Sequence, residues 1–486
     1  MLRRLTSLLS LVAILSAHYS SAQSFEEFER QMNARFGAFQ TQADKEYEDF
    51  YREVNARYAD FIKRAWVKVE EQPAKPAPKP NPPEPPKFDP QAPVLPQAEL
   101  SLSGISRPVI TPKPIPVQPI PEQEVPEAKM TIKFFGAECE LRADKDDFDI
   151  AMPDGGEGSV ADSWQTLADG RTNAMINDCL TLRDELQLCD WAYYQLAKTI
   201  SRELYGNDTC NEAIVLQAFI MTQSGYKVRM GRTDNELRLL LSSDSTIYSA
   251  SYLLIGDVQF YVLHSTGGKP IFICDFEFPG ESIFSMRMDK LPKLPVDEVA
   301  GRELQAKKFG NLKAVVNHNK NMIDFLETFP HSSIVNYAIA SLDESAKSAL
   351  YPVLKKEIDQ MPEDVAANML INFVQTAFEY KVDAEQFGYE RPFFANETLY
   401  YPYSDCEDRA LLFATLVREL IGLEVVLLDY PDHIATAVHF TQDLKGDYMM
   451  VEGKKYLICD PTYIGANIGT CIPSYRDVAV QIAAIQ

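Results

Sequence analysis

A cysteine, a histidine and an aspartate follow one another near the end of the chain in contexts that suit covalent catalysis. Cys406 stands in SDCEDRALL, directly before an apolar helical run, and Ser404 with Glu407 matches an S-x-x-E capping box. We therefore expect Cys406 in the first helical turn, where backbone N–H groups and the helix dipole favour a thiolate. Asp405, Glu407 and Asp408 oppose this by like charge, so activation of the thiol requires a nearby imidazolium.

The next two apolar stretches supply a base and a carboxylate. In the strand-like HIATAVH, alternation places His433, Ala435 and His439 on one face. The following strand, YLIC, ends at Asp460, because Pro461 cannot continue a ladder. We expect Asp460 to accept an Nδ1–H bond from the imidazole of His433 and to hold its orientation. This order provides a nucleophile, a base and an orienting group.

The motifs SDCEDRA, DHIATAV and CDPTY resemble those of the bacterial branch of the transglutaminase-like superfamily, over a region from about residue 310 to the end. The resemblance implies a papain-like cysteine fold with Cys406 as nucleophile, His433 as general base and acid, and Asp460 as the orienting carboxylate. The chain departs from the family at Ala435, where an aromatic residue is usual. His439 therefore remains a rival base.

An oxyanion formed at this site needs donors. We expect the backbone N–H of Cys406 to be one, and a side chain ahead of it to be the other. Tyr400, Tyr401 and Tyr403 are the candidates, and the sequence does not rank them.

The same plan occurs earlier in the chain. Residues 210–228 and 406–425 share a cysteine, an acidic residue two positions on, an apolar helix, a glycine and a strand, with cysteine-to-glycine intervals of 15 and 16. Downstream, IFICDF matches YLICDP and aligns Asp275 with Asp460. The first copy has Glu236 but no histidine in its strand TDNELRLLL, and His264 lies too late in the pattern. We interpret this copy as degenerate, with a structural or substrate-binding role.

The elements before the two modules predict export and presentation. Residues 1–22 combine two arginines, a short apolar run and small residues, which is typical of a cleaved signal peptide. In residues 23–71 apolar side chains recur at intervals of 3, 4 and 4, which predicts a long amphipathic helix or coiled coil that self-associates or meets a partner through 25–65. Residues 72–127 hold 18 of the 31 prolines, which predicts a semi-rigid polyproline II spacer.

Composition excludes several classes of partner and cofactor. The net charge of −23 disfavours nucleic acid and anionic membranes. Among the eight cysteines no C-x-x-C pair occurs, and there is no HExxH, so we expect no metal site and no cofactor. Some cysteines could pair after export, but Cys274 and Cys459 lie in apolar runs and are expected to be buried hydrophobic residues.

The sequence thus predicts an α+β protein with two transglutaminase-like modules in tandem, at 128–290 (degenerate) and 305–486 (catalytic). We expect an exported bacterial protein, periplasmic or extracellular, that does not insert into the membrane after signal cleavage. The predicted function is a cysteine peptidase or amidase that acts on a protein or peptide through a thioester. The alternatives are a catalytically inactive binding or scaffolding protein, a cross-linking acyltransferase, and a regulatory partner of another protease.

Overall fold

The computed structural model describes residues 25–78, 84–93, 95–107, 129–248, 250–264 and 266–485. The predicted signal peptide, 1–22, lies outside them. The fold is mixed α+β, as predicted. The chain divides between Val54 and Asn55, inside the helix α2 (Phe25–Ile62), into two compact units that are described separately. In the described part of the chain, no helix combines the length and apolarity that crossing a membrane requires.

The first unit, as far as it is described, consists of the larger part of α2. The predicted self-association through 25–65 stays a prediction. All elements that follow belong to the second unit.

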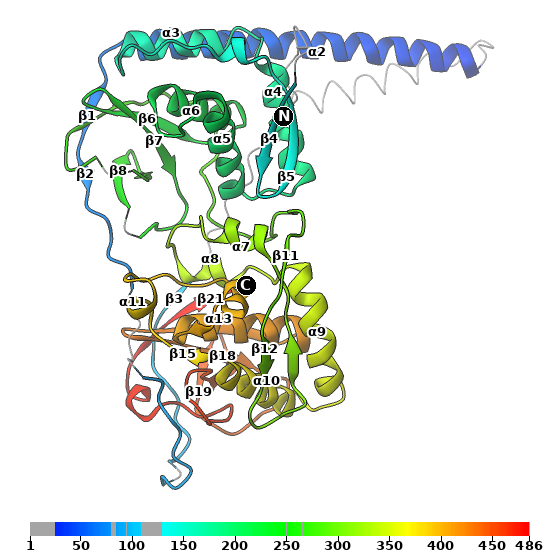
Figure 1. Cartoon of the computed structure of the whole chain (residues 1–486), viewed down its shortest axis with the longest axis vertical. Coiled ribbons are helices and arrows are strands. Elements are labelled where there is room, and N and C mark those ends of the chain that lie inside the picture. The colour runs from blue at the N-terminus through cyan, green and yellow to red at the C-terminus, as the bar shows by residue number, and fades with distance from the viewer. Residues whose placement is uncertain are drawn as a thin grey trace. The chain divides into compact units, whose positions relative to one another are not determined.

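One part of the second unit is built on a seven-stranded sheet with the order β1-β10-β6-β7-β9-β8-β2, in which every pairing is antiparallel. Its strands are β1 (Val67–Val69), β2 (Glu71–Gln72), β6 (Val228–Thr233), β7 (Glu236–Ser242), β8 (Ser251–Ile255), β9 (Val258–Val262) and β10 (Ile271–Cys274). The helix α6 (Asn211–Gln223) is apolar on nearly all sides, and it packs on β6 and β7 beside α5 (Asp190–Tyr205) (Figure 1). Around them lie the hairpin β4 (Lys129–Phe134) and β5 (Ala137–Arg142), the 3₁₀ turn η1 (Lys145–Phe148), α3 (Glu157–Leu167) and α4 (Asn173–Glu185).

The other part is built on a six-stranded sheet with the order β19-β20-β18-β17-β21-β3. Its strands are β3 (Leu102–Ser106), β17 (Glu424–Tyr430), β18 (His433–His439), β19 (Tyr448–Val451), β20 (Lys454–Cys459) and β21 (Val480–Ala484). The helix α13 (Cys406–Leu416) packs chiefly on β18, and all of its residues are buried. A helix enclosed on every side fits its apolar sequence and fixes the position of its first residue.

Shorter elements surround α13. The helices are α7 (Lys320–Leu326), α8 (Ile334–Ala338), α9 (Glu344–Ile358), α10 (Glu363–Ala377), α11 (Asp383–Gln386) and α12 (Ala395–Tyr400). Three two-stranded sheets contain β11 (Glu298–Val299) with β14 (His318–Asn319), β12 (Glu303–Gln305) with β13 (Lys313–Val315), and β15 (Glu379–Tyr380) with β16 (Tyr403–Ser404). The 3₁₀ turn η3 (Pro473–Tyr475) precedes the last strand.

The two parts share a helix-hairpin unit. Both α6 and α13 lead to a glycine with positive φ, Gly225 (88°) and Gly422 (80°), and then to a hairpin with a two-residue turn. A π-helical turn, η2 (Val417–Ile421), extends α13. A π-helical turn typically arises from one inserted residue, which accounts for the cysteine-to-glycine intervals of 15 and 16.

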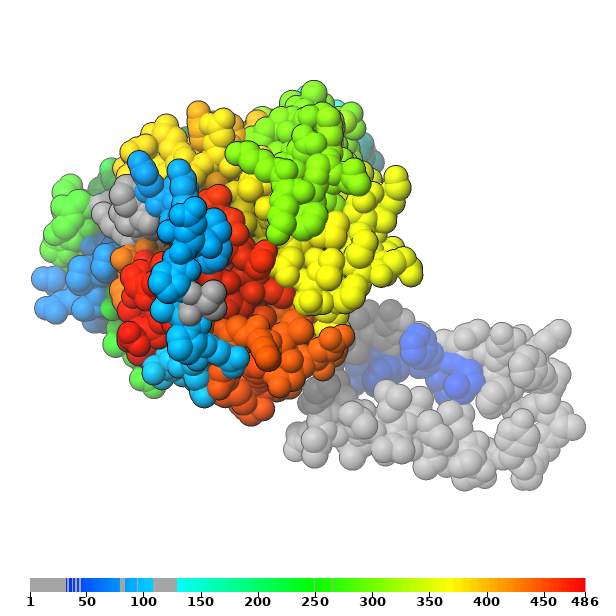
Figure 2. All heavy atoms as spheres, turned by 90° about the horizontal axis from the view of Figure 1, so that it is seen from below, coloured from blue at the N-terminus to red at the C-terminus, as the bar shows by residue number. Residues whose placement is uncertain are grey.

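The proline-rich segment is not a free spacer throughout, contrary to the sequence prediction. Residues 102–106 form β3, which pairs in parallel with β21. Leu100 donates its backbone N–H to the carbonyl of Tyr448 (2.8 Å), and Phe88 donates to Ile464 (2.9 Å). Figure 2 shows this segment, in blue, across the red C-terminal strands. The pairing is possible because residues 97–107 lack proline and keep their N–H donors.

Candidate active site

Cys406 is the first residue of α13 and is completely buried. The residue before it, Asp405, is the N-cap, and its N–H donates to the carboxylate of Asp408 (3.2 Å). The helix start therefore agrees with the prediction, but the predicted capping box of Ser404 and Glu407 is wrong by one residue. Ser404 Oγ instead accepts a hydrogen bond from the buried Arg409 (3.1 Å).

His433 and Asp460 are buried and joined by a hydrogen bond of 2.8 Å between Nε2 and Oδ2. The other oxygen of Asp460 accepts the backbone N–H groups of Thr462 (2.8 Å) and Tyr463 (3.2 Å), which fixes the carboxylate at the end of β20. The predicted bond to Nδ1 is wrong, because Nε2 is the nitrogen that meets Asp460. Nδ1 has no hydrogen-bond partner in the described chain and remains available.

The sulfur of Cys406 lies beside the start of β18, where His433 stands. It accepts the backbone N–H of Ile434, the residue after His433. It also donates to Glu407 Oε2 (3.3 Å). Tyr475 stacks on the imidazole of His433 with ring centroids 5.2 Å apart and a 17° interplanar angle. The structure therefore joins His433 to Asp460 and places the Cys406 sulfur against the residue that follows His433. The sulfur and the imidazole do not hydrogen-bond each other in the described chain.

The thiol is in its neutral form in this arrangement. Burial first, and then the carboxyl groups of Glu407 and Asp405, raise the pKa of Cys406 well above its ordinary value. Burial likewise raises the pKa of both carboxyl groups. The predicted lowering by the helix start is outweighed, because a buried anion among acidic neighbours loses more solvation than the dipole returns.

Glu407 belongs to an acidic group that sequence reasoning missed. Carboxylate oxygens of Asp383, Glu390 and Glu407 all lie within 4.8 Å of one another. Burial raises the pKa of Asp383 to about 7, and its Oδ1 has no hydrogen-bond partner in the described chain. Hard oxygen ligands of this kind could hold Ca²⁺ or Mg²⁺. The sequence prediction considered only clustered cysteine and histidine ligands, so it could not find three carboxylates that come from separate segments of the chain.

None of the three tyrosines named as oxyanion donors has a contact with Cys406 among those found in the described chain. Tyr401 stacks on Phe393 (centroids 4.8 Å apart) and donates to Glu327, while the ammonium of Lys381 lies 5.2 Å from the ring centroid of Tyr403. The ring of Tyr400 meets His318 edge to face at 5.3 Å.

Two other tyrosines, Tyr380 and Tyr475, are near enough to the thiol for Cys406 to raise the pKa of their hydroxyls. For Tyr380, burial is the first cause and Cys406 the second. Tyr380 reaches the site because it pairs with Ser404 in the short parallel ladder of β15 and β16. No spacing in the sequence points to it, since that ladder joins residues 24 positions apart.

The rival base, His439, stands at the opposite end of β18 from His433. The two are six positions apart, which is about 20 Å along a strand. Its Nδ1 is within hydrogen-bond distance of the carbonyl of Lys455 (2.9 Å). His439 is thus not brought to the thiol.

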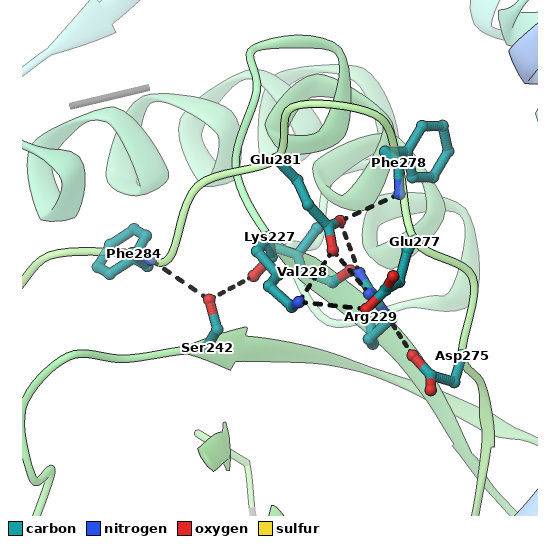
Figure 3. A network of polar contacts seen from close by, with 9 residues as sticks. All are labelled: Lys227, Val228, Arg229, Ser242, Asp275, Glu277, Phe278, Glu281 and Phe284. Carbon is teal, nitrogen blue, oxygen red and sulfur yellow. Dashed lines mark hydrogen bonds and ion pairs between the residues drawn. The ribbon is translucent and has the colours of Figure 1, made fainter. Parts of the chain in front are cut away.

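The alignment of Asp275 with Asp460 is wrong in three dimensions. Asp275 follows β10, which pairs with β6, whereas β20 pairs with β18, the second strand of its hairpin. Asp275 instead accepts a hydrogen bond from Arg229 Nε (2.9 Å), and the rest of that guanidinium is bound by Glu281 (Figure 3). Asp275 therefore belongs to a structural ion-pair network.

The eight cysteines are all described, and all are free thiols. Cys459 is fully buried and Cys274 is 2% exposed, so the prediction that they are buried hydrophobic residues is confirmed.

A cavity of about 290 Å³ approaches the thiol. Glu407 and Ile434, the two residues that hydrogen-bond the Cys406 sulfur, line it together with Tyr430. Tyr248 and Ser332 lie on its wall as well. Cys406, His433 and Asp460 are not among the residues that line it, so the cavity reaches the site only through these neighbours of the sulfur.

Comparisons with known proteins identify no relative: no protein-family model, no curated protein and no solved structure matches the chain.

Proposed function

We propose that the protein is a cysteine-dependent hydrolase, a peptidase or amidase, in which Cys406, His433 and Asp460 act as nucleophile, base and orienting group. The observation that carries the proposal is the 2.8 Å contact between His433 Nε2 and Asp460 Oδ2, which leaves Nδ1 unpaired. The next residue on the strand, Ile434, is the one whose backbone N–H meets the sulfur of Cys406. A base held at one nitrogen and unpaired at the other is what thiol activation requires.

The proposed reaction uses each group in turn. His433 Nδ1 takes the thiol proton as the sulfur attacks the carbonyl carbon, and a thioester replaces the amide. The proton passes to the leaving amine, and water then hydrolyses the thioester with the same imidazole as base. The backbone N–H of Cys406 and the hydroxyl of Tyr380 are the proposed oxyanion donors.

The neutral, buried thiol implies a resting state that substrate must open. The sulfur donates to Glu407 at rest, and catalysis requires this contact to be exchanged for one with His433 Nδ1. Glu407 lines the cavity, so a substrate that enters it and displaces this carboxyl group would favour the exchange. The family proposed for the C-terminal module is the transglutaminase-like superfamily, and the site proposed for the mature protein is outside the cytoplasm of a bacterium.

The same closed thiol is the observation that favours the second candidate, a catalytically inactive binding or scaffolding protein. The two candidates differ in one property. An enzyme forms and hydrolyses a thioester at Cys406, and a scaffold does neither.

The test is turnover of p-nitrophenyl acetate, a small activated acyl ester that fits the cavity. Site-resolved mass spectrometry follows acetylation of Cys406. Wild type should acetylate and deacetylate at this residue, Cys406→Ala should lose the reaction, and His433→Ala should slow it about 100- to 10,000-fold, the range for general acid–base catalysis. Exposed Gln442→Ala serves as the control. Acetylation that is equally fast in His433→Ala would contradict the proposal.

A further inference from the structure

The first module carries an open cavity at the place that the candidate active site occupies in the second. The cavity measures about 530 Å³ and is lined by Cys210, Glu236, Arg238 and His264, among others. Cys210 is the N-cap of α6 and is half-buried, and His264 is exposed just after β9. Unlike Cys406, this thiol is accessible to solvent.

The hairpin register identifies Glu236 as the counterpart of His433. Thr233 pairs with Glu236 across the two-residue turn of the first hairpin, and Tyr430 pairs with His433 across the same turn of the second. The glycine after each helix precedes these residues by 11 positions in both modules, at Gly225 and Gly422. The position of the base in the second module is therefore held by a carboxylate in the first.

The third strand of each set identifies the counterpart of Asp460. In the second module, the residue four positions after His433 is Ala437, which pairs with Ile458 on β20. In the first, the residue four positions after Glu236 is Leu240, which pairs with Val262 on β9. Two residues beyond these partners stand Asp460 and His264, respectively.

In the first module, the position that Asp460 occupies after β20 of the second module is thus occupied by His264, after β9. Sequence alignment missed this because it matched β10, not β9, with β20. We propose that Cys210 and His264 form a second thiol site, with the imidazole arriving from β9, that accepts acyl groups from esters or amides.

The surroundings of His264 suit a base. Desolvation by the surrounding protein atoms first, and then the positive charge of Lys198, lower the pKa of His264. Asp208 opposes this and Arg238 adds to it, and the lowered pKa favours the neutral ring, which can accept a proton. Arg238 lines the same cavity, and its positive charge would favour a developing oxyanion there.

The reaction at this site is balanced without an added oxidant or cofactor. The sulfur of Cys210 forms a bond to the acyl carbon, and His264 takes the thiol proton. The bond from that carbon to the leaving oxygen or nitrogen breaks, and the leaving group takes the proton from His264. Water hydrolyses the thioester, which releases the acid and restores the thiol.

The test measures acetylation of the full chain by p-nitrophenyl acetate, cysteine by cysteine. Cys189 is the internal control, because it is also a half-buried N-cap, of α5, and it is not among the residues that line this cavity. We expect Cys210 to react at least about tenfold faster than Cys189, and His264→Gln to remove that advantage. His264 is exposed, so this variant should fold, which far-UV circular dichroism checks.

Either of two results would overturn the inference: equal rates at Cys210 and Cys189, or a fast Cys210 that His264→Gln does not slow. Because Cys210 and Cys406 fall in different peptides, failure here is distinguishable from failure of the function proposed for the second module.

Discussion

Gln375 is predicted to position Asp460 through the loop that follows it. The side chain is 2% exposed on α10, and its Nε2 donates to the carbonyls of Tyr463 (2.8 Å) and Ala466 (3.0 Å). Its Oε1 accepts the N–H of Gly465 (3.3 Å). Gln375→Leu keeps most of the volume but removes these hydrogen bonds. The Tyr463 carbonyl still accepts the N–H of Ala466 (3.1 Å), whereas the Ala466 carbonyl and the Gly465 N–H lose their partner.

The cost follows from those contacts. A lost hydrogen bond contributes about 1 kcal/mol net, and an unsatisfied buried group costs about 1 to 3 kcal/mol. Because the loop can relax around some of the groups, we expect the free energy of unfolding to fall by about 2 to 4 kcal/mol. That loss corresponds to about a 30- to 1,000-fold change in an equilibrium constant.

The assay is amide hydrogen exchange of the peptides covering β17 and β18. Tryptophan fluorescence is unsuitable, because Trp66, Trp164 and Trp191 all lie ahead of this part of the chain. The exchange protection factors of these amides should fall about 30- to 1,000-fold in Gln375→Leu. Acetylation of Cys406 should also slow. Gln442→Leu makes the same change at an exposed position and should alter neither. Protection that stays within threefold of wild type would refute the assignment to Gln375.

Two further predictions concern pH and the rival histidine. The pKa of Asp383 rises from 3.8 to about 7 on folding, so the folded state binds more protons and stability should fall as pH rises from about 4 to 7. The expected loss of stability is on the order of 4 kcal/mol. In Asp383→Asn this pH-dependent loss should be smaller, which hydrogen-exchange measurements across this range can check. An unchanged pH profile in the variant would argue against this carboxyl group. His439→Gln should leave acetylation of Cys406 within twofold of wild type, since His439 lies about 20 Å along the strand from His433; a tenfold loss would restore His439 as a candidate base.

Local patterns predicted the parts of the site that depend on neighbouring residues. The helix that starts at Cys406, the strand from His433 to His439 and the strand that ends before Asp460 follow from apolar periodicity and from Pro461. The cap was misplaced by one residue because both Ser404 and Asp405 are good N-caps, and the contact of Ser404 with Arg409 decides between them.

Features that depend on which strands become neighbours could not be read from the sequence. Asp275 follows an apolar strand that looks like β20, but pairing with β6 places it at Arg229. Tyr380 reaches the thiol through a ladder with a distant segment. The acidic group at Glu407 forms only when Asp383 and Glu390 come close to the start of α13. The choice of Nε2 or Nδ1 as the partner of Asp460 depends on side-chain orientation, which periodicity does not encode.

The most direct measurement is the alkylation rate of Cys406 by iodoacetamide in wild type and His433→Gln, with Cys459 as a buried cysteine outside the triad. If the imidazole withdraws the thiol proton, the substitution slows Cys406 at least about tenfold and leaves Cys459 unchanged. Equal Cys406 rates in the two proteins would show that His433 does not activate this sulfur.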